Sequence, residues 1–223
     1  MIAGDVRGLV SAWGSDGSFD VLGGVEPDVR IVAVAVDRAG ARLAHADGRE
    51  GGRVMVRDLG GLGVDGPLET ELAAVRDLAF LPDGALVMAG LGAASIEVRD
   101  PSDPTRVRAR FRGADELVEV ATGHGLIAGA GPGVVVVFDG ALAPRWIAPA
   151  GEHAPVSVAL TAGGRFVITA GADGSLRARD ALDGAEIAVA DVADPRAVRV
   201  HPGGAAVVVG SRDGAVRAFE CRR

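Results

Sequence analysis

The sequence predicts an all-β protein built from a repeated unit of about 40 residues, and three observations lead to this prediction. Glycine is frequent, with 34 residues in a chain of 223, whereas there are only 11 prolines and 6 phenylalanines. Apolar and polar residues alternate in many short segments, as they do in strands whose successive side chains point to opposite faces. A segment of similar sequence also returns along the whole chain. Since 48% of the residues are hydrophobic, the composition favours a packed core over disorder.

The repeat is clearest in short strands that end in an acidic residue. These are VMVRD, IEVRD, VVVFD, LRARD and VRAFE, which end at Asp58, Asp100, Asp139, Asp180 and Glu220, and VSAW, which aligns one residue short of this position. The residues before the acid are the repeat anchors: Trp13, Arg57, Arg99, Phe138, Arg179 and Phe219. They are spaced by 44, 42, 39, 41 and 40 residues, which is too regular for chance. An acid that recurs once in each repeat indicates a structural role in a turn rather than catalysis.

Each period contains the same succession of strands and turns. A first strand leads into a turn that ends in glycine, at Gly40, Gly84, Gly125, Gly164 and Gly204. A second strand and a second glycine turn follow, and then come the anchor strand and a weaker fourth strand. The residues directly before the first turns are expected to be buried equivalents: Val36, Phe80, Leu160 and Val200. Four short antiparallel strands every ~40 residues match one blade of a β-propeller. We therefore predict a β-propeller of about six four-stranded blades, formed by residues 1–223 as a single domain.

Two segments, VRDLAFLPDGALVMAG…SIEVRD and VSVALTAGGRFVITAGADGSLRARD, resemble the repeats of the WD-repeat (WD40-like) family. The similarity lies in the order strand, Pro-Asp-Gly turn, strand, Asp-Gly turn and final Trp-Asp, and it extends over nearly the whole chain. The repeats are degenerate, because Trp13 is the only tryptophan among the anchors. The resemblance implies a tetrad of hydrogen-bonded His, Ser or Thr, Asp and Trp side chains in a blade. In the fifth blade its members would be His153, Thr169 and Asp173, with Arg179 in the place of the tryptophan.

The two ends of the chain predict incomplete blades. MIAGDVRGLVSAW aligns without gaps with VVVGSRDGAVRAF, so that Gly4 falls on Gly210 and Trp13 on Phe219. The first residues therefore belong to the second strand of a blade. We expect the first blade to lack its first strand and the last blade to lack its fourth. A six-bladed ring with two imperfect blades is one interpretation, and a piece of a larger propeller is the other.

An arginine stripe is the first candidate site. The segment RVRARFR places four arginines on one face of a predicted outermost strand of the third blade: Arg106, Arg108, Arg110 and Arg112. Four aligned guanidinium groups suit an acidic partner or phosphates. The structural alternative is that charges on an edge strand prevent edge-to-edge pairing.

A second candidate surface follows from the resemblance. WD-repeat proteins are interaction scaffolds, and their similarity implies a binding face made of the second-to-third-strand turns and the loops that enter each blade. In this chain that face includes Glu152, His153, Ala172, Asp173, Arg212 and Asp213.

Composition argues against several other classes of function. The net charge of -7 disfavours nucleic-acid binding, which needs a basic surface. No apolar run approaches the ~20 residues of a membrane span, and the first residues lack a secretory signal, so the cytoplasm is the expected compartment. The single cysteine, Cys221, excludes an internal disulfide. The four histidines have no metal-site spacing, and no nucleophile or phosphate-binding motif is present, so that we expect neither cofactor nor metal.

These observations together predict a non-catalytic scaffold that binds one or more proteins. Two alternatives stay open: a regulatory propeller module separated from a larger multidomain protein, and a small-ligand-binding or enzymatic propeller. Ligand-dependent changes in melting temperature would distinguish the last of these from a scaffold.

Overall fold

The computed structural model describes residues 2–14, 16–24, 29–49, 51, 53–60, 64–100, 103, 105–113, 116–149, 155–161, 163–201, 204 and 206–220. In this part of the chain every regular element is a β-strand and none is a helix, which confirms the all-β prediction. The chain divides into two compact units, Met1–Gly113 and Ala114–Arg223. The single domain over residues 1–223 therefore stays a prediction.

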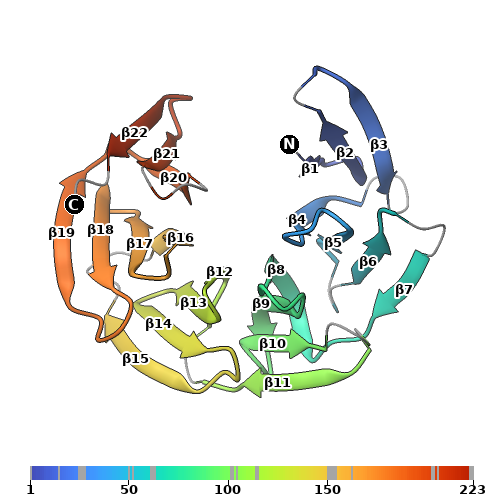
Figure 1. The fold of residues 1–223 in the computed structure, drawn as a ribbon, viewed down its shortest axis with the longest axis horizontal. Coiled ribbons are helices and arrows are strands. Elements are labelled where there is room, and N and C mark those ends of the chain that lie inside the picture. Colours follow the sequence, from blue (N-terminus) through green and yellow to red (C-terminus); the bar gives the residue numbers. More distant parts are fainter. Residues whose placement is uncertain are drawn as a thin grey trace. The chain divides into compact units, whose positions relative to one another are not determined.

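The first unit contains three antiparallel sheets that follow one another along the chain (Figure 1). Blade 1 consists of β1 (Ile2–Gly4), β2 (Leu9–Trp13) and β3 (Phe19–Gly24). Blade 2 consists of β4 (Ile31–Val36), β5 (Arg42–Asp47), β6 (Val54–Asp58) and β7 (Val64–Leu68). Blade 3 consists of β8 (Leu72–Phe80), β9 (Leu86–Gly92), β10 (Ile96–Arg99) and β11 (Val107–Phe111).

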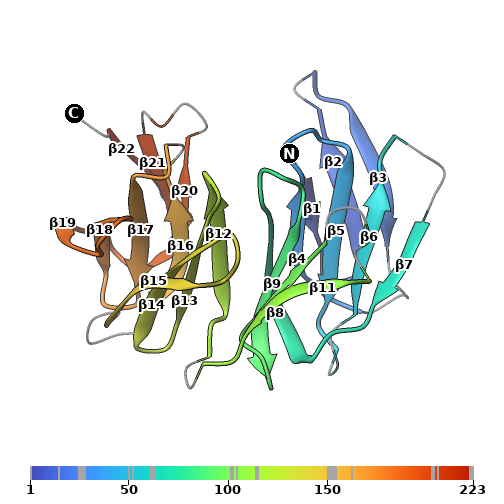
Figure 2. The same cartoon turned by 60° about the horizontal axis from the view of Figure 1, so that its bottom comes forward.

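The second unit has the same organisation, and Figure 2 shows its three sheets from a second side. Blade 4 consists of β12 (Glu119–Gly123), β13 (Leu126–Gly131), β14 (Val134–Asp139) and β15 (Pro144–Pro149). Blade 5 consists of β16 (Pro155–Leu160), β17 (Phe166–Gly171), β18 (Ser175–Asp180) and β19 (Glu186–Asp191). Blade 6 consists of β20 (Pro195–Val200), β21 (Ala206–Ser211) and β22 (Val216–Glu220). Each strand pairs with its neighbour in sequence, which is the meander of a propeller blade, and six such blades confirm the predicted fold class.

The core of each unit lies between neighbouring blades. In the first unit Val10 and Leu43 pack between blades 1 and 2, and a larger cluster fills the space between blades 2 and 3. In the second unit apolar side chains fill the spaces between blades 4 and 5 and between blades 5 and 6. A blade with a neighbour on both sides is covered on both faces, and β5 and β17 are consequently buried at every position after the first.

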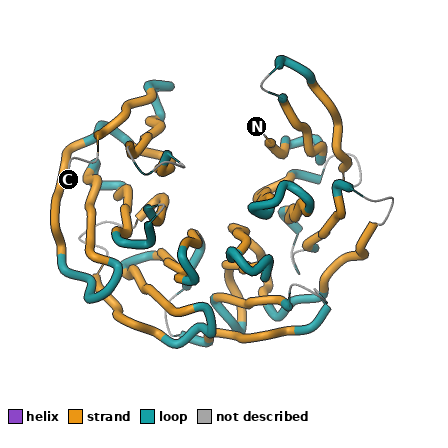
Figure 3. The backbone as a smooth tube through the Cα atoms, in the orientation of Figure 1, coloured by secondary structure: helices purple, strands orange, loops and turns teal. Residues whose placement is uncertain are grey.

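The predicted turns and anchor strands are confirmed. Figure 3 shows the described loops between successive strands of a sheet as short connections. The glycines that end the five predicted first turns have φ between 63° and 85°, a region that L side chains rarely adopt. All six anchors lie on the predicted strands, namely β2, β6, β10, β14, β18 and β22.

Blades 1 and 6 each have three strands in the described part of the chain, as the sequence predicts. The pairing of Gly4 with Val10 in blade 1 matches the pairing of Gly210 with Val216 in blade 6. β1 is therefore the equivalent of a second strand, and no strand in the described residues precedes it in blade 1.

The four residues before the first turns end β4, β8, β16 and β20, so their equivalence is confirmed. The expected burial is complete for Leu160, which is 7% exposed, and partial for Val36, Phe80 and Val200, which are half-buried and pack against the core. These residues lie at the end of a sheet beside a turn, where solvent reaches one side of the side chain.

Candidate partner-binding surface

Four of the predicted partner-binding residues lie in two equivalent turns of the second unit. Ala172 and Asp173 are in the turn between β17 and β18, and Arg212 and Asp213 are in the turn between β21 and β22. The Asp173 carboxylate accepts hydrogen bonds from the backbone N–H and the hydroxyl of Ser175, at 2.9 and 2.6 Å. Asp213 accepts one from the backbone N–H two residues later, at 2.9 Å. Both aspartates therefore fix their turns, and Ala172 and Arg212 are exposed beside them.

The loop that enters blade 6 joins these two turns. The backbone N–H of Val192 donates to the carbonyl of Gly174 at 2.7 Å, and the backbone N–H of Arg212 donates to the carbonyl of Asp194 at 3.0 Å. Asp194 has a φ of 42°, which aspartate tolerates better than most residues, and its carboxylate pairs with Arg196 at 3.0 Å. We call residues 172–174, 192–196 and 212–214 the turn surface.

Sequence reasoning missed Asp194 and Arg196. The Asp-Pro pair at residues 194–195 is a turn signal that would have marked this loop. Glu152 and His153, which the sequence analysis assigns to the same kind of surface, lie outside the described residues.

The predicted arginine stripe runs along β11 and the residue on each side of it, at the edge of blade 3, as expected. Arg106 precedes the strand and is exposed. The Arg108 guanidinium forms an ion pair with Asp83 at 2.5 Å, and Asp83 belongs to the first turn of the same blade. This part of the stripe is thus in contact with an acid of its own blade.

The rest of the stripe contacts two glutamates. Arg112 pairs with Glu71 at 2.7 Å, and Arg110 lies 3.2 Å from Glu71 and 3.5 Å from Glu97. The hydrogen bond from Arg112 lowers the pKa of the Glu71 carboxyl, and the charges of both arginines lower it further. Three of the four arginines therefore have acidic partners within the chain, which is a structural use of the stripe. The structure brings the stripe together with these acids and places it in the first unit, whereas the turn surface belongs to the second.

Three repeat anchors are arginines, and each reaches back to the preceding blade. Their guanidinium groups donate to backbone carbonyls in or directly after the last strand of that blade: Arg57 to Leu22 at 3.1 Å, Arg99 to Glu69, and Arg179 to Pro149 at 3.3 Å. In blade 5, Thr169 is buried on β17, but its supposed tetrad partner Arg179 makes this contact between blades. The anchor position thus holds neighbouring blades together in this chain.

The Arg99 anchor forms a buried ion pair with Glu97. The two side chains are 3% and 0% exposed, and their charged atoms lie 2.8 Å apart. Arg99 also donates to the carbonyl of Thr105 at 3.0 Å, and Glu97 accepts from the backbone N–H of Glu71 at 2.7 Å. Both carboxylate oxygens of Glu97 and both terminal nitrogens of Arg99 have partners, whereas the Arg99 Nε has none among the described residues. The pair is therefore a structural element of blade 3.

His45 is fully buried on β5, and neither of its ring nitrogens has a hydrogen-bond partner among the described residues. Burial and the nearby charge of Arg57 lower its pKa to about 4, and the Asp47 carboxylate acts in the opposite direction. His45 is therefore neutral near pH 7.

No group of three or more His, Cys, Asp or Glu side chains in the described residues is arranged to hold a metal ion. The same part of the chain has no helix with the length and apolar character needed to cross a membrane. Comparison with models of known protein families gives no match. Comparison with curated protein sequences likewise gives no match.

Proposed function

We propose that the protein is a non-catalytic scaffold of degenerate WD-type repeats that binds another protein through the turn surface. The observation that carries this proposal is the pair of hydrogen bonds that tie the loop before blade 6 to the two equivalent turns. Loops held on a rigid β framework are a common location for binding residues.

The charges of the turn surface suit a protein partner. Arg196 and Asp194 are about half exposed, and Arg212 and Asp213 are exposed beside them. Arginine is enriched among the residues that dominate binding energy in protein interfaces. A surface of mixed sign in a chain of net charge -7 suits a protein better than nucleic acid. We place this interaction in the cytoplasm.

The test is co-purification of the tagged protein from its native cell, comparing the wild type with Arg212→Glu. Arg145→Glu is the matched control, because Arg145 is an exposed arginine on β15, outside the turn surface. We expect a partner that the wild type and the control both retain and that Arg212→Glu loses. Retention of that partner by Arg212→Glu and by the double variant Arg196→Glu/Arg212→Glu would refute the turn surface as its binding site.

A melting-temperature screen with metal ions and sugars tests the ligand-binding alternative. A saturable rise in melting temperature would indicate a small-molecule site. The proposed scaffold predicts no such rise.

A further inference from the structure

The last strand of blade 6 has a sheet edge that a further strand would complete. In the described part of the chain β22 pairs only with β21, whereas blades 3, 4 and 5 carry a fourth strand at the equivalent edge. An edge strand presents backbone N–H and C=O groups that an added strand can use.

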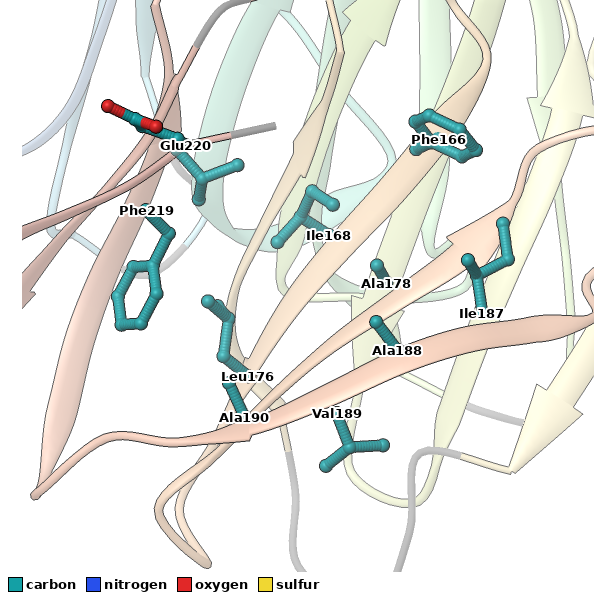
Figure 4. Close-up of a pocket in the computed structure, with 11 residues that line it drawn as sticks. Phe166, Ile168, Leu176, Ala178, Ile187, Ala188, Val189, Ala190, Phe219 and Glu220 are labelled. Carbon is teal, nitrogen blue, oxygen red and sulfur yellow. The ribbon is translucent and has the colours of Figure 1, made fainter. Parts of the chain in front are cut away.

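An apolar groove of about 300 Å³ lies next to this edge, between blades 5 and 6 (Figure 4). Leu176, Ala178 and Ala190 line it from blade 5, and Phe219 lines it from β22. Figure 4 shows these side chains on the two facing walls. Ala188 also borders the groove and is exposed.

The repeat shows that this space is covered elsewhere in the unit. Trp146 on β15 and Ala188 on β19 occupy equivalent positions in blades 4 and 5. Each pairs with the residue directly before its repeat anchor, namely Val137 and Ala178. Trp146 is half-buried and its indole N–H donates to the carbonyl of Ala181 in blade 5 at 3.0 Å. The segment that follows β18 thus covers blade 4, but no described segment follows β22 to cover Ala188.

The repeat also indicates the charge that an added strand should carry. Arg217 on β22 is the equivalent of Arg177 on β18, since each lies near the aspartate of its turn, at 3.9 Å from Asp213 and 3.7 Å from Asp173. In blade 5 the guanidinium of Arg177 pairs with Glu186 of the fourth strand at 3.0 Å. Arg217 is 42% exposed, so an acid on an added strand can reach it.

We infer that β22 accepts an extended segment of a partner protein as its fourth strand. That segment carries an acidic residue that pairs with Arg217, as Glu186 of β19 pairs with Arg177 in blade 5, and small or branched apolar residues that enter the groove. Main-chain hydrogen bonds to β22 supply affinity, and the groove and Arg217 supply specificity. The inference rests on the proposed function of protein binding but assigns it a second surface.

The probe is a fluorescent peptide with the sequence of residues 185–192, AEIAVADV, titrated with the protein and followed by anisotropy. We expect saturable binding to the wild type. Arg217→Glu should weaken it about fivefold, the scale of one exposed ion pair. A peptide with lysine in place of its glutamate should bind Arg217→Glu more tightly than it binds the wild type.

Ala190→Phe fills the groove without changing charge, and it should weaken binding of the peptide at least tenfold. Arg145→Glu is the control and should bind like the wild type. Far-ultraviolet circular dichroism and melting curves must match the wild type for each variant, and a milder Ala190→Val replaces any variant that fails to fold. No saturable binding to the wild type, or equal affinity for all variants, would overturn the inference. Sedimentation could instead show that the protein forms a dimer and that the peptide dissociates it. That result would overturn the proposal of a partner protein and assign the β22 edge to a second copy of this chain.

The partner from the co-purification separates this inference from the turn surface. If Arg217→Glu and Ala190→Phe retain that partner and Arg212→Glu loses it, the partner does not bind by strand addition and the proposed function stands. If Arg217→Glu and Ala190→Phe lose the partner and Arg212→Glu retains it, the turn surface is not its binding site and the β22 edge is supported.

Discussion

Replacement of Arg99 by methionine removes the charged half of a buried ion pair and keeps most of the side-chain volume. The guanidinium lies 2.8 Å from the Glu97 carboxylate, and it also donates to the carbonyls of Thr105 and Glu69. The last of these contacts joins blade 3 to the preceding blade. Arg99→Met therefore tests both the buried pair and the contact between blades.

The expected loss follows from what Glu97 retains. Breaking a buried pair by removing one partner costs about 3–5 kcal/mol, because a charge is left without compensation. Glu97 keeps the backbone N–H of Glu71 at 2.7 Å and the Arg110 guanidinium at 3.5 Å, which favours the lower half of this range. We expect Arg99→Met to lower the free energy of unfolding by about 3–4 kcal/mol. The double variant Glu97→Leu/Arg99→Met should lose only about 1 kcal/mol, since no charge stays buried.

Arg179→Met is the matched control, because it removes the equivalent anchor where the pairing is weaker. Its partner Glu186 is 37% exposed and 3.4 Å away, so a loss of about 1 kcal/mol is expected. Urea unfolding of the Arg99 variants is followed through Trp13 in a Trp146→Phe background, and that of Arg179→Met through Trp146 in a Trp13→Phe background. Each tryptophan then lies in the same unit as the substituted residue. A loss for Arg99→Met no larger than for Arg179→Met would refute the reasoning, and so would a double variant as unstable as the single one.

Three further substitutions test the pH response, the core and a turn. The His45 pKa of about 4 in the folded protein lies below its ordinary 6.5, so the unfolded chain binds the proton first. Stability should therefore be intact above about pH 6.5 and fall by about 2–3 kcal/mol by pH 4.5 in urea titrations; a His45→Met variant that keeps the same slope would contradict this. Phe80→Ala should lose about 1–3 kcal/mol and Leu160→Ala about 2–4, because Phe80 is only half-buried; the reverse order in urea melts would show that the burial is wrong. A Cβ at Gly164 would lie 2.7 Å from the Cβ of His124 in the neighbouring turn, whereas a Cβ at Gly125 would meet nothing within 4 Å. The Gly164→Ala variant should therefore melt several degrees below the Gly125→Ala variant. Equal melting temperatures would disprove the contact with His124.

The strands, turns and incomplete blades could be predicted because their causes are local. Alternation fixes the two faces of a strand, and glycine at residues such as Gly40 and Gly84 permits the positive φ of the turns. The alignment of the two ends placed Gly4 on Gly210, and the structure pairs them equivalently, Gly4 with Val10 and Gly210 with Val216. The burial of Phe80 could not be predicted as reliably, since it depends on how far solvent reaches into the end of a sheet.

The surroundings of the candidate sites could be predicted less well, because they join segments that lie far apart in the sequence. Arg99 reaches a carbonyl 30 residues earlier, and the arginine in place of the expected tryptophan gave no indication of this contact. The stripe was found as an alternating pattern, but its partners Asp83 and Glu71 lie in other segments. Asp194 joins the turn surface through a backbone hydrogen bond, which leaves no side-chain pattern to detect.

Hydrogen–deuterium exchange of the protein, alone and with the partner captured by co-purification, tests the proposed binding surface most directly. Exchange slows where a partner covers backbone amides or stabilises the segments that hold them. We predict slower exchange in the complex at residues 172–174, 192–196 and 212–214, with β11 unchanged. Slower exchange confined to β11 and the arginine stripe, or no change at the turn surface, would contradict the proposed scaffold function of these turns.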